Sequence, residues 1–190
     1  MAIIKTTAAP VKGFRVWYFI QAVTAELGSD AILPAFQTEG GTTLGGDNID
    51  EQTKQGRIIQ KSTDEQSVDL TQYFVPSDPA SQVIEQAKVQ GLSVKVWRVV
   101  IDENSAEGEE EEKTYPAKFG YGLPEEIEYS DGEDLVEISY TLQIVGRLQD
   151  GRFPLTDEDV AVIENMYDYQ NPGETTGNYD AIEPTPPVDE

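Results

Sequence analysis

The chain has 190 residues, 36 acidic against 13 basic side chains, a formal net charge of -23, and neither cysteine nor histidine. This length suits one domain with appendages, which can fold without disulfides or metal. The chain therefore lacks thiolate metal sites, a cysteine nucleophile, the commonest general base and the commonest transition-metal ligand. The few, scattered basic residues argue against tight binding to nucleic acid or to anionic membranes. Composition thus makes catalysis and phosphate binding less expected than a structural or protein-binding role.

The sequence also carries no targeting or membrane signal. No apolar run approaches the length of a membrane span. The first seven residues lack the apolar core and the cleavage pattern of a secretory signal. We therefore expect a protein that is made and kept in a cytoplasm.

The first half of the chain is predicted to consist of strands around one long loop. Alternating aromatic and branched residues predict a strand over residues 12–23. Glycines and a proline interrupt any periodicity over residues 24–50, which predicts a long loop, and loops of this size are usually functional or become ordered against a partner. Two strands over residues 56–62 and 65–74, joined by a short turn, are predicted to follow.

A helix over residues 78–90 has the clearest signals in the sequence. Ser77 is the expected N-cap, Asp78 complements the positive helix end, and Gly91 ends the helix. Apolar residues between them recur at helical spacing and form one stripe. The next segment, residues 92–102, is rich in valine and predicts a strand.

The second half is predicted to contain an acidic loop, three further strands and a short helix. Residues 103–113 include four consecutive glutamates and predict a solvated loop. Short strands are predicted over residues 115–121 and 125–130, and a long alternating strand over residues 134–145 would place one face on a core and the other in water. A turn at residues 150–151 precedes a helix over residues 157–167, with Thr156 as its cap and Asp159 reaching back to it. The proline-rich acidic residues 171–190 are predicted to be a flexible tail.

No motif in the chain indicates a catalytic or metal site. The acidic clusters lack the alternating oxygen ligands and central glycine of a calcium loop, so a solvated charged surface is the default interpretation. The glycine pairs at residues 40–41 and 45–46 lack the following Lys-Ser or Lys-Thr of a phosphate loop and are interpreted as hinges. Carboxylate pairs suited to glycoside hydrolysis arise by chance in a chain this acidic. Two classes remain, a structural or assembly protein and a binding module.

Several segments between residues 52 and 159 resemble one known family. They are a Lys-x-Gly segment at residues 54–56, the predicted helix, the strand VKVWRVVID after its closing glycine, and the stretch AKFGYGLPEEIEYSDGEDLVEISYTLQIVGRLQDGRFPLTDED. The last contains the glycine pair Gly120 and Gly122 and a long strand ending at Gly146. In order and spacing, these segments resemble the major tail proteins, or tail tube proteins, of phages with long non-contractile tails (siphophages) of the lactococcal type.

The resemblance implies a mainly β (α+β) fold, an antiparallel β-sandwich or half-barrel with one flanking helix and a short C-terminal helix, in a domain over residues 1–170. It implies a non-enzymatic virion protein, assembled in the host cytoplasm, without cofactor or metal. Six copies would form a ring, and rings would stack into a tube around the tape measure protein. Tail terminator and distal tail proteins would bind at the ends, and DNA would pass through the lumen without specific binding.

Two groups of residues are predicted to serve assembly. Polar alternation places one group on lumen-facing strands, where negative charge would repel phosphates: Asp69, Thr71, Glu126, Glu128, Glu137 and Thr141. The other group lies in the predicted loop and is expected to contact a neighbouring subunit and to become ordered on assembly: Glu39, Gly40, Gly41, Gly45, Gly46 and Asp47. The alternative is an acidic binding module such as a DNA mimic, which would bind a basic partner in a salt-dependent way. A carboxylate-dependent hydrolase comes third.

Overall fold

The structure is a computed structural model that describes residues 9–108, 113–132 and 134–163. Most of these residues are in strands, with two α-helices and two short 3-10 turns. The elements in chain order are η1 (Gly13–Arg15), β1 (Val16–Ala22), β2 (Gln37–Gly45), β3 (Asn48–Thr53), β4 (Gly56–Lys61), β5 (Glu65–Tyr73), α1 (Pro79–Gln90), β6 (Val94–Val100), η2 (Glu103–Ser105), β7 (Thr114–Ser130), β8 (Glu137–Ile144), β9 (Gln149–Pro154) and α2 (Asp157–Ile163).

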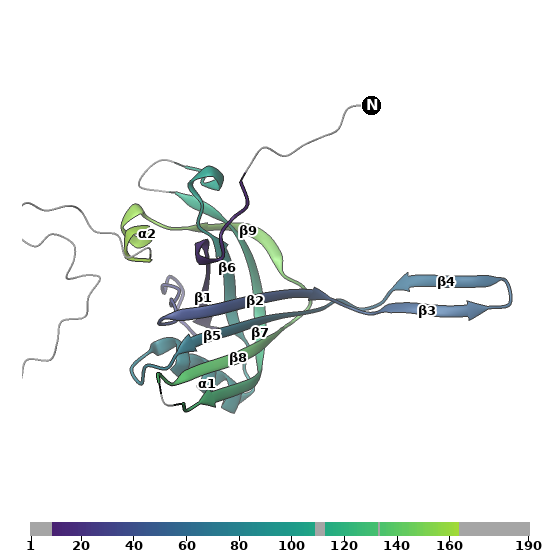
Figure 1. Cartoon of the computed structure of the whole chain (residues 1–190), viewed down its shortest axis with the longest axis horizontal. Helices are drawn as coiled ribbons and strands as arrows, with labels where there is room; N and C mark the ends of the chain where they lie inside the picture. Colours follow the sequence, from purple (N-terminus) through teal and green to yellow (C-terminus); the bar gives the residue numbers. More distant parts are fainter. Residues whose placement is uncertain (1–8, 109–112, 133, 164–190) are drawn as a thin grey trace, which may run out of the picture.

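Seven of the strands form one antiparallel sheet in the order β1-β6-β7-β8-β5-β2. The seventh strand, β9, pairs with residues 114–119 of β7. It lies on the same side of β7 as β8, which pairs with residues 122–130. The sheet curls strongly, so that β1, β6 and β9 stand across the direction of β2, β5 and β8 (Figure 1). The predicted mainly β half-barrel with a flanking helix is confirmed.

Two apolar clusters hold the curled sheet together. The larger one fills the inside of the curl and includes Tyr18, Leu70 and Leu142, with α1 contributing Ile84 and Ala87. The second lies on the opposite face of β1, β6 and β7, where α2 and the segment before β2 cover it. Alternation along β1 and β6 explains this layering, because successive side chains of a strand point to opposite faces: Tyr18 lies in the first cluster and Phe19 in the second.

Helix α1 begins one residue later than the predicted cap implies. Asp78, not Ser77, is the N-cap, since its carboxylate accepts hydrogen bonds from the backbone N–H groups of Ala80 and Ser81. Gly91 ends the helix in the left-handed region (φ +66°), where a residue without a Cβ is favoured. Ser77 and Asp78 could both cap a helix. Ser77 is exposed, and the buried Asp78 makes the capping hydrogen bonds.

The predicted loop over residues 24–50 is wrong from Gln37 onward. Residues 37–45 form β2, which pairs with β5, and Asn48 begins β3. The two strands predicted at residues 56–62 and 65–74 exist as β4 and β5, but they pair with β3 and β2 rather than with each other. Exposed strands rich in glycine and threonine lack the apolar alternation that identifies a half-buried strand.

Three smaller predictions in the second half meet different outcomes. The two short strands predicted around residues 115–130 are one 17-residue strand, β7, with a bulge between Pro124 and Glu126. The turn predicted at residues 150–151 is wrong, because these residues lie within β9. The capped helix is confirmed as far as Ile163, with Asp159 Oδ2 accepting from Thr156 N at 2.9 Å and Thr156 Oγ1 at 2.7 Å. The four consecutive glutamates and the tail lie outside the described residues.

Candidate assembly surfaces

One face of the curled sheet carries the polar side chains of β5, β8 and β7. We call it the polar face, and all six residues predicted to face a lumen lie on it: Asp69, Thr71, Glu126, Glu128, Glu137 and Thr141. Thr141 is paired with Asp69 on one side and with Glu126 on the other, and Thr141 Oγ1 donates a hydrogen bond of 2.6 Å to Asp69 Oδ1. The structure therefore brings together residues that are up to 72 positions apart in the chain.

The polar face extends onto β2, which the sequence did not indicate. Glu39 is paired with Thr71, Gly41 with Asp69 and Thr43 with Ser67. The opposite side of the same strands is buried core, with Leu70 and Tyr140 at 2% and 3% exposure. The contrast between the two sides explains why the register is fixed, since a shift by one residue would put the carboxylates into the core.

The strands that carry the polar face end in two unpaired edges. β2 is a terminal strand of the sheet and pairs with β5 alone. At the other side, β7 pairs with β6 only as far as Gly122, so β8 is the one strand that pairs with its residues 123–130, and Lys88 of α1 donates a hydrogen bond to the Glu125 carbonyl there. Unpaired edges invite pairing with another chain unless they are covered or charged.

The first and last strands of the sheet meet across a seam that is made by side chains. The Gln37 side chain imitates a strand, accepting from the backbone N–H of Tyr18 at 3.1 Å and donating to the Tyr18 carbonyl at 2.8 Å. Gly40 lies flat on the Tyr18 ring, where a Cβ would stand 2.3 Å from a ring carbon. This close approach, rather than the predicted hinge motion, explains a glycine at position 40.

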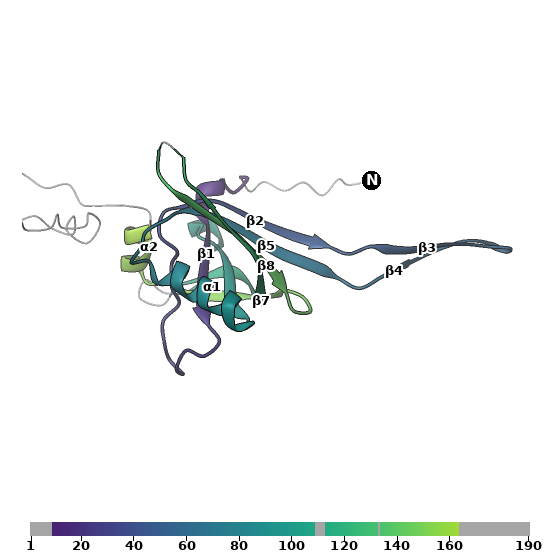
Figure 2. The same cartoon turned by 90° about the horizontal axis from the view of Figure 1, so that it is seen from below.

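Beyond the sheet, β3 and β4 form a separate two-stranded hairpin, which we call the arm (residues 48–61). The arm projects from the body at the end of β2 and β5 (Figures 1 and 2). Each of its strand residues is exposed, including Ile49, Ile58 and Ile59 at 47%, 46% and 56%. An isolated hairpin of two strands is marginally stable in water, so this arm has the character of a contact element.

Of the six residues predicted to contact a neighbouring subunit, three lie in the first half of β2 and three at the base of the arm. Glu39, Gly40, Gly41 and Gly45 belong to β2, and Gly46 and Asp47 form the link between β2 and β3. Gly46 has a φ of +137°, and a Cβ there would stand 2.6 Å from the backbone oxygen of Thr63, in the link between β4 and β5. These residues are part of the folded sheet, and their contact with a neighbour stays a prediction.

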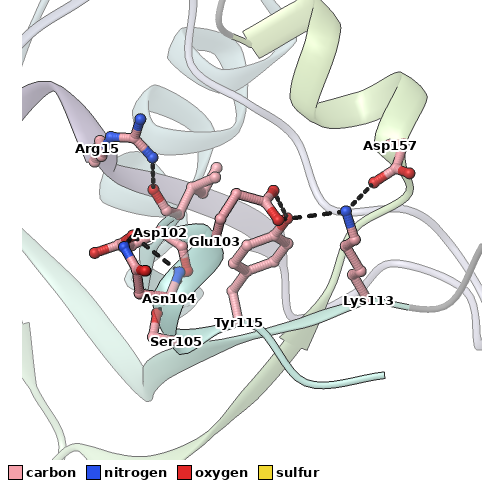
Figure 3. A network of polar contacts seen from close by, with 9 residues as sticks. Arg15, Asp102, Glu103, Asn104, Ser105, Lys113, Tyr115 and Asp157 are labelled. Atoms are coloured by element: carbon pink, nitrogen blue, oxygen red, sulfur yellow. Dashed lines mark hydrogen bonds and ion pairs between the residues drawn. The ribbon is translucent and has the colours of Figure 1, made fainter. Parts of the chain in front are cut away.

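A network of charged and polar groups ties the segment between β6 and β7 to α2 (Figure 3). Lys113 Nζ lies 2.9 Å from Asp157 and 3.4 Å from Glu103, and the hydrogen bond to Asp157 contributes most to raising the pKa of Lys113. Tyr115 Oη donates to Glu103 Oε1 at 3.2 Å, and burial, with the Glu103 charge, raises the pKa of Tyr115. Arg15 donates to the Ile101 carbonyl beside this network. The arrangement fastens strands and helix together.

The described residues do not form a metal centre or a membrane span. Among them, no group of three or more carboxylate side chains is placed to hold a metal ion. No helix in the described ranges is long and apolar enough to cross a membrane.

Comparison with known proteins gives a consistent result. Residues 10–150 match the family model described as phage tail tube protein. The chain is 38% identical over 179 residues to a tail tube protein of Bacillus phage SPP1, with 93% of this chain and 66% of that protein covered. It thus spans about two thirds of the length of that relative.

Solved structures agree with the family match. The structure of the SPP1 tail tube matches with a TM-score of 0.64 and 36% identity over 88% of this chain and 95% of that one. The tail of an empty gene transfer agent particle, refined with C6 symmetry, matches with a TM-score of 0.54 at 12% identity over 74% of this chain and 98% of that one, which shows a shared fold. The polar half-barrel with its projecting arm therefore belongs to the phage tail tube protein family, whose members are structural components of the virion tail and not enzymes.

Proposed function

We propose that six copies of this chain join into a ring, that rings stack into the tail tube, and that the polar face lines the lumen through which the genome leaves. The observation that carries this proposal is a polar sheet face bounded by two unpaired strand edges. Pairing the β2 edge of one copy with the free part of β7 in the next would cover both of these edges. Closure of this kind removes the edges that would otherwise lead to uncontrolled association.

The proposed ring is wide enough for a DNA duplex to pass through it. Each copy supplies the strands β2, β5, β8 and β7 to the wall. Six copies then give a barrel of roughly 24 strands (six times four). With about 4.8 Å between strands and a tilt of about 40°, the circumference is about 150 Å and the backbone diameter about 48 Å. Side chains on both walls leave room for a DNA duplex in such a lumen.

The charge of the polar face supports passage without binding. The polar face carries four carboxylates per copy on β5, β7 and β8, those of Asp69, Glu126, Glu128 and Glu137. The six residues predicted to face a lumen include no lysine or arginine. A wall of this sign repels phosphates, so DNA slides without being held. A tape measure protein would occupy the same lumen before the genome, and terminator and distal tail proteins would close the ends of the tube.

The assembly proposal is tested by concentrating the purified protein and imaging it by negative-stain electron microscopy, with light scattering on a dilute sample. Rings or hollow tubes are expected. A protein that stays monomeric at every concentration would overturn the proposal and favour an acidic binding module.

The lumen assignment has its own test. Glu126→Lys with Glu128→Lys should leave tubes intact but make them retain DNA, since the lumen would lose its repulsion. Glu26→Lys, at an exposed site in the segment before β2, is the matched control and should retain none. Placement of Asp69 and Glu128 on the outer wall of an assembled tube would refute this assignment.

A further inference from the structure

The strand residues of the arm are exposed on both faces, and the structure contains an apolar pocket elsewhere on its surface. We propose that the pocket between β1, β9 and α2 receives the arm of a second copy, with Ile49 and Ile58 packed against its walls. This inference rests on the proposed stacking of rings and adds to it the site at which successive copies are joined.

The pocket is apolar inside and acidic at its rim. It has a volume of about 590 Å³ and is lined by Phe19, Leu33, Trp97, Phe153, Leu155 and Val162, among others. The Phe19 and Phe153 rings stack at 4.8 Å between centroids. Asp30 and Asp159 stand among the lining residues, and the exposed Glu158 precedes Val162 by one turn of α2.

The two faces of the arm differ, and one of them suits this pocket. Ile49 is paired with Gln60 and Ile58 with Glu51, which puts both isoleucines on the same face as diagonal neighbours. Ile59 is on the other face, opposite Asp50, whose carboxylate forms an ion pair with Arg57. The face with two isoleucines is therefore the less charged one and is the better match to an aromatic pocket.

The lining residues favour this pocket over the larger groove on the molecule, because the groove has more polar and charged side chains. The arm carries Lys54, Arg57 and Lys61 against Asp50 and Glu51, a net charge of +1 (three minus two) in a chain whose total is -23. The larger groove, of about 860 Å³ at the seam between β1 and β2, is lined by Glu39, Arg98 and Lys118 among others, and Lys118 forms an ion pair with Asp150. The isoleucine face of the arm carries Glu51, whereas Arg57 and Lys61 lie on the opposite face, so the apolar, partly aromatic lining of the smaller pocket, and not charge, makes it the better match.

The placement of the two surfaces agrees with stacking. The arm and α2 lie at opposite ends of the long axis in both views (Figures 1 and 2). Copies repeated along that axis would point the arm of one toward the α2 end of the next. The six-residue strands of the arm span about 20 Å, enough to cross from one copy into a pocket of its neighbour.

The absence of cysteine makes a crosslinking experiment specific. The variant Ile58→Cys/Val162→Cys places one thiol on the arm and one at the pocket, and both sites are about half exposed, so folding should be unaffected. After mild oxidation of assembled tubes, denaturing gels should show a ladder of linked chains, because each copy donates one arm and accepts another. The matched control is Ile59→Cys/Val162→Cys, on the opposite arm face, and should give at least tenfold less ladder.

A second measurement does not depend on oxidation. Ile58→Ser should raise the concentration needed for tube formation by roughly ten- to a hundredfold, the loss expected for an apolar side chain removed from a buried contact. Ile59→Ser should raise it far less.

The outcomes separate the two proposals. Tubes that form without an Ile58–Val162 ladder would overturn the pocket assignment and leave the tube function standing; the pocket would then be covered by something else, such as the chain's own residues after Ile163. A ladder from Ile58→Cys/Leu44→Cys instead would place the arm in the larger groove and refute this site. If the unmodified chain never assembles, the proposed function fails and the pocket assignment fails with it.

Discussion

Replacing Asp78 with alanine should strongly destabilise the fold, because this side chain joins α1 to the sheet. Asp78 is 4% exposed. Its carboxylate accepts from Ala80 N and Ser81 N at 3.2 Å, from Ser81 Oγ at 2.9 Å and from Gln72 Nε2 at 2.7 Å. Gln72 in turn accepts from Tyr140 Oη at 3.2 Å, so one buried network connects α1, β5 and β8.

The expected fall in the free energy of unfolding is the sum of two contributions. Removing an N-cap carboxylate costs about 1–2 kcal/mol. Leaving the buried Gln72 amide with only its weaker bond to Ser81 costs about 1–2 kcal/mol more. The sum is about 2–4 kcal/mol in the free energy of unfolding, which for a chain of this size corresponds to a fall in Tm of roughly 5–15 °C.

Thermal unfolding of the unassembled protein, followed by circular dichroism, measures this loss. Ser77→Ala is the matched control: it removes the neighbouring hydroxyl, which could cap the helix on sequence grounds but is exposed. Its effect should stay within about 0.5 kcal/mol. A Ser77→Ala variant that loses as much stability as Asp78→Ala would show that the cap has been assigned to the wrong residue.

Further predictions concern the seam, the arm and one tyrosine. Gly40→Ala should destabilise the monomer by about 1–3 kcal/mol in urea unfolding, because a Cβ would meet the Tyr18 ring at 2.3 Å, whereas Gly41→Ala, with its nearest neighbour at 3.8 Å, should be tolerated. Replacing the arm with a short turn should leave a folded monomer that cannot form tubes; unchanged tubes would contradict its assigned role. Burial, with the hydrogen bond to Glu85, raises the pKa of Tyr129 from its usual 10.0 to about 12. The stability that Tyr129 contributes should therefore be complete below pH 10 and be lost as pH rises toward 12. A Tyr129→Phe variant that keeps the full amplitude of tyrosinate absorbance near pH 12 would refute the assignment.

The elements with strong local signals were predictable from sequence. The valine-rich β6, the alternating β8 and the apolar stripe of α1 each repeat with the period of their own structure. The capping pair Thr156 and Asp159 is local as well, since its partners are three residues apart. Family resemblance in the same segments led to the fold class.

The missed elements depend on contacts between distant segments. β2 and the arm are largely exposed, so no apolar alternation marks them. β2 forms by pairing with β5, a partner that lies outside its own segment of the sequence. The bulge in β7 interrupts alternation and made one strand look like two. Gly40 contacts Tyr18 because β1 and β2 meet at the seam, and nothing in the sequence around either residue indicates that meeting.

The order of polar and apolar residues along each strand is fixed by sequence, and it requires β5, β7 and β8 each to have a solvent-facing side and a core-facing side. It does so because strand alternation is a local property with a period of two residues. Which strands are neighbours depends on the folded chain, and strand pairing is what brings carboxylates from three strands to one face beside two unpaired edges. Strand pairing is set by the sum of many long-range contacts in a common core, which no short stretch of sequence contains.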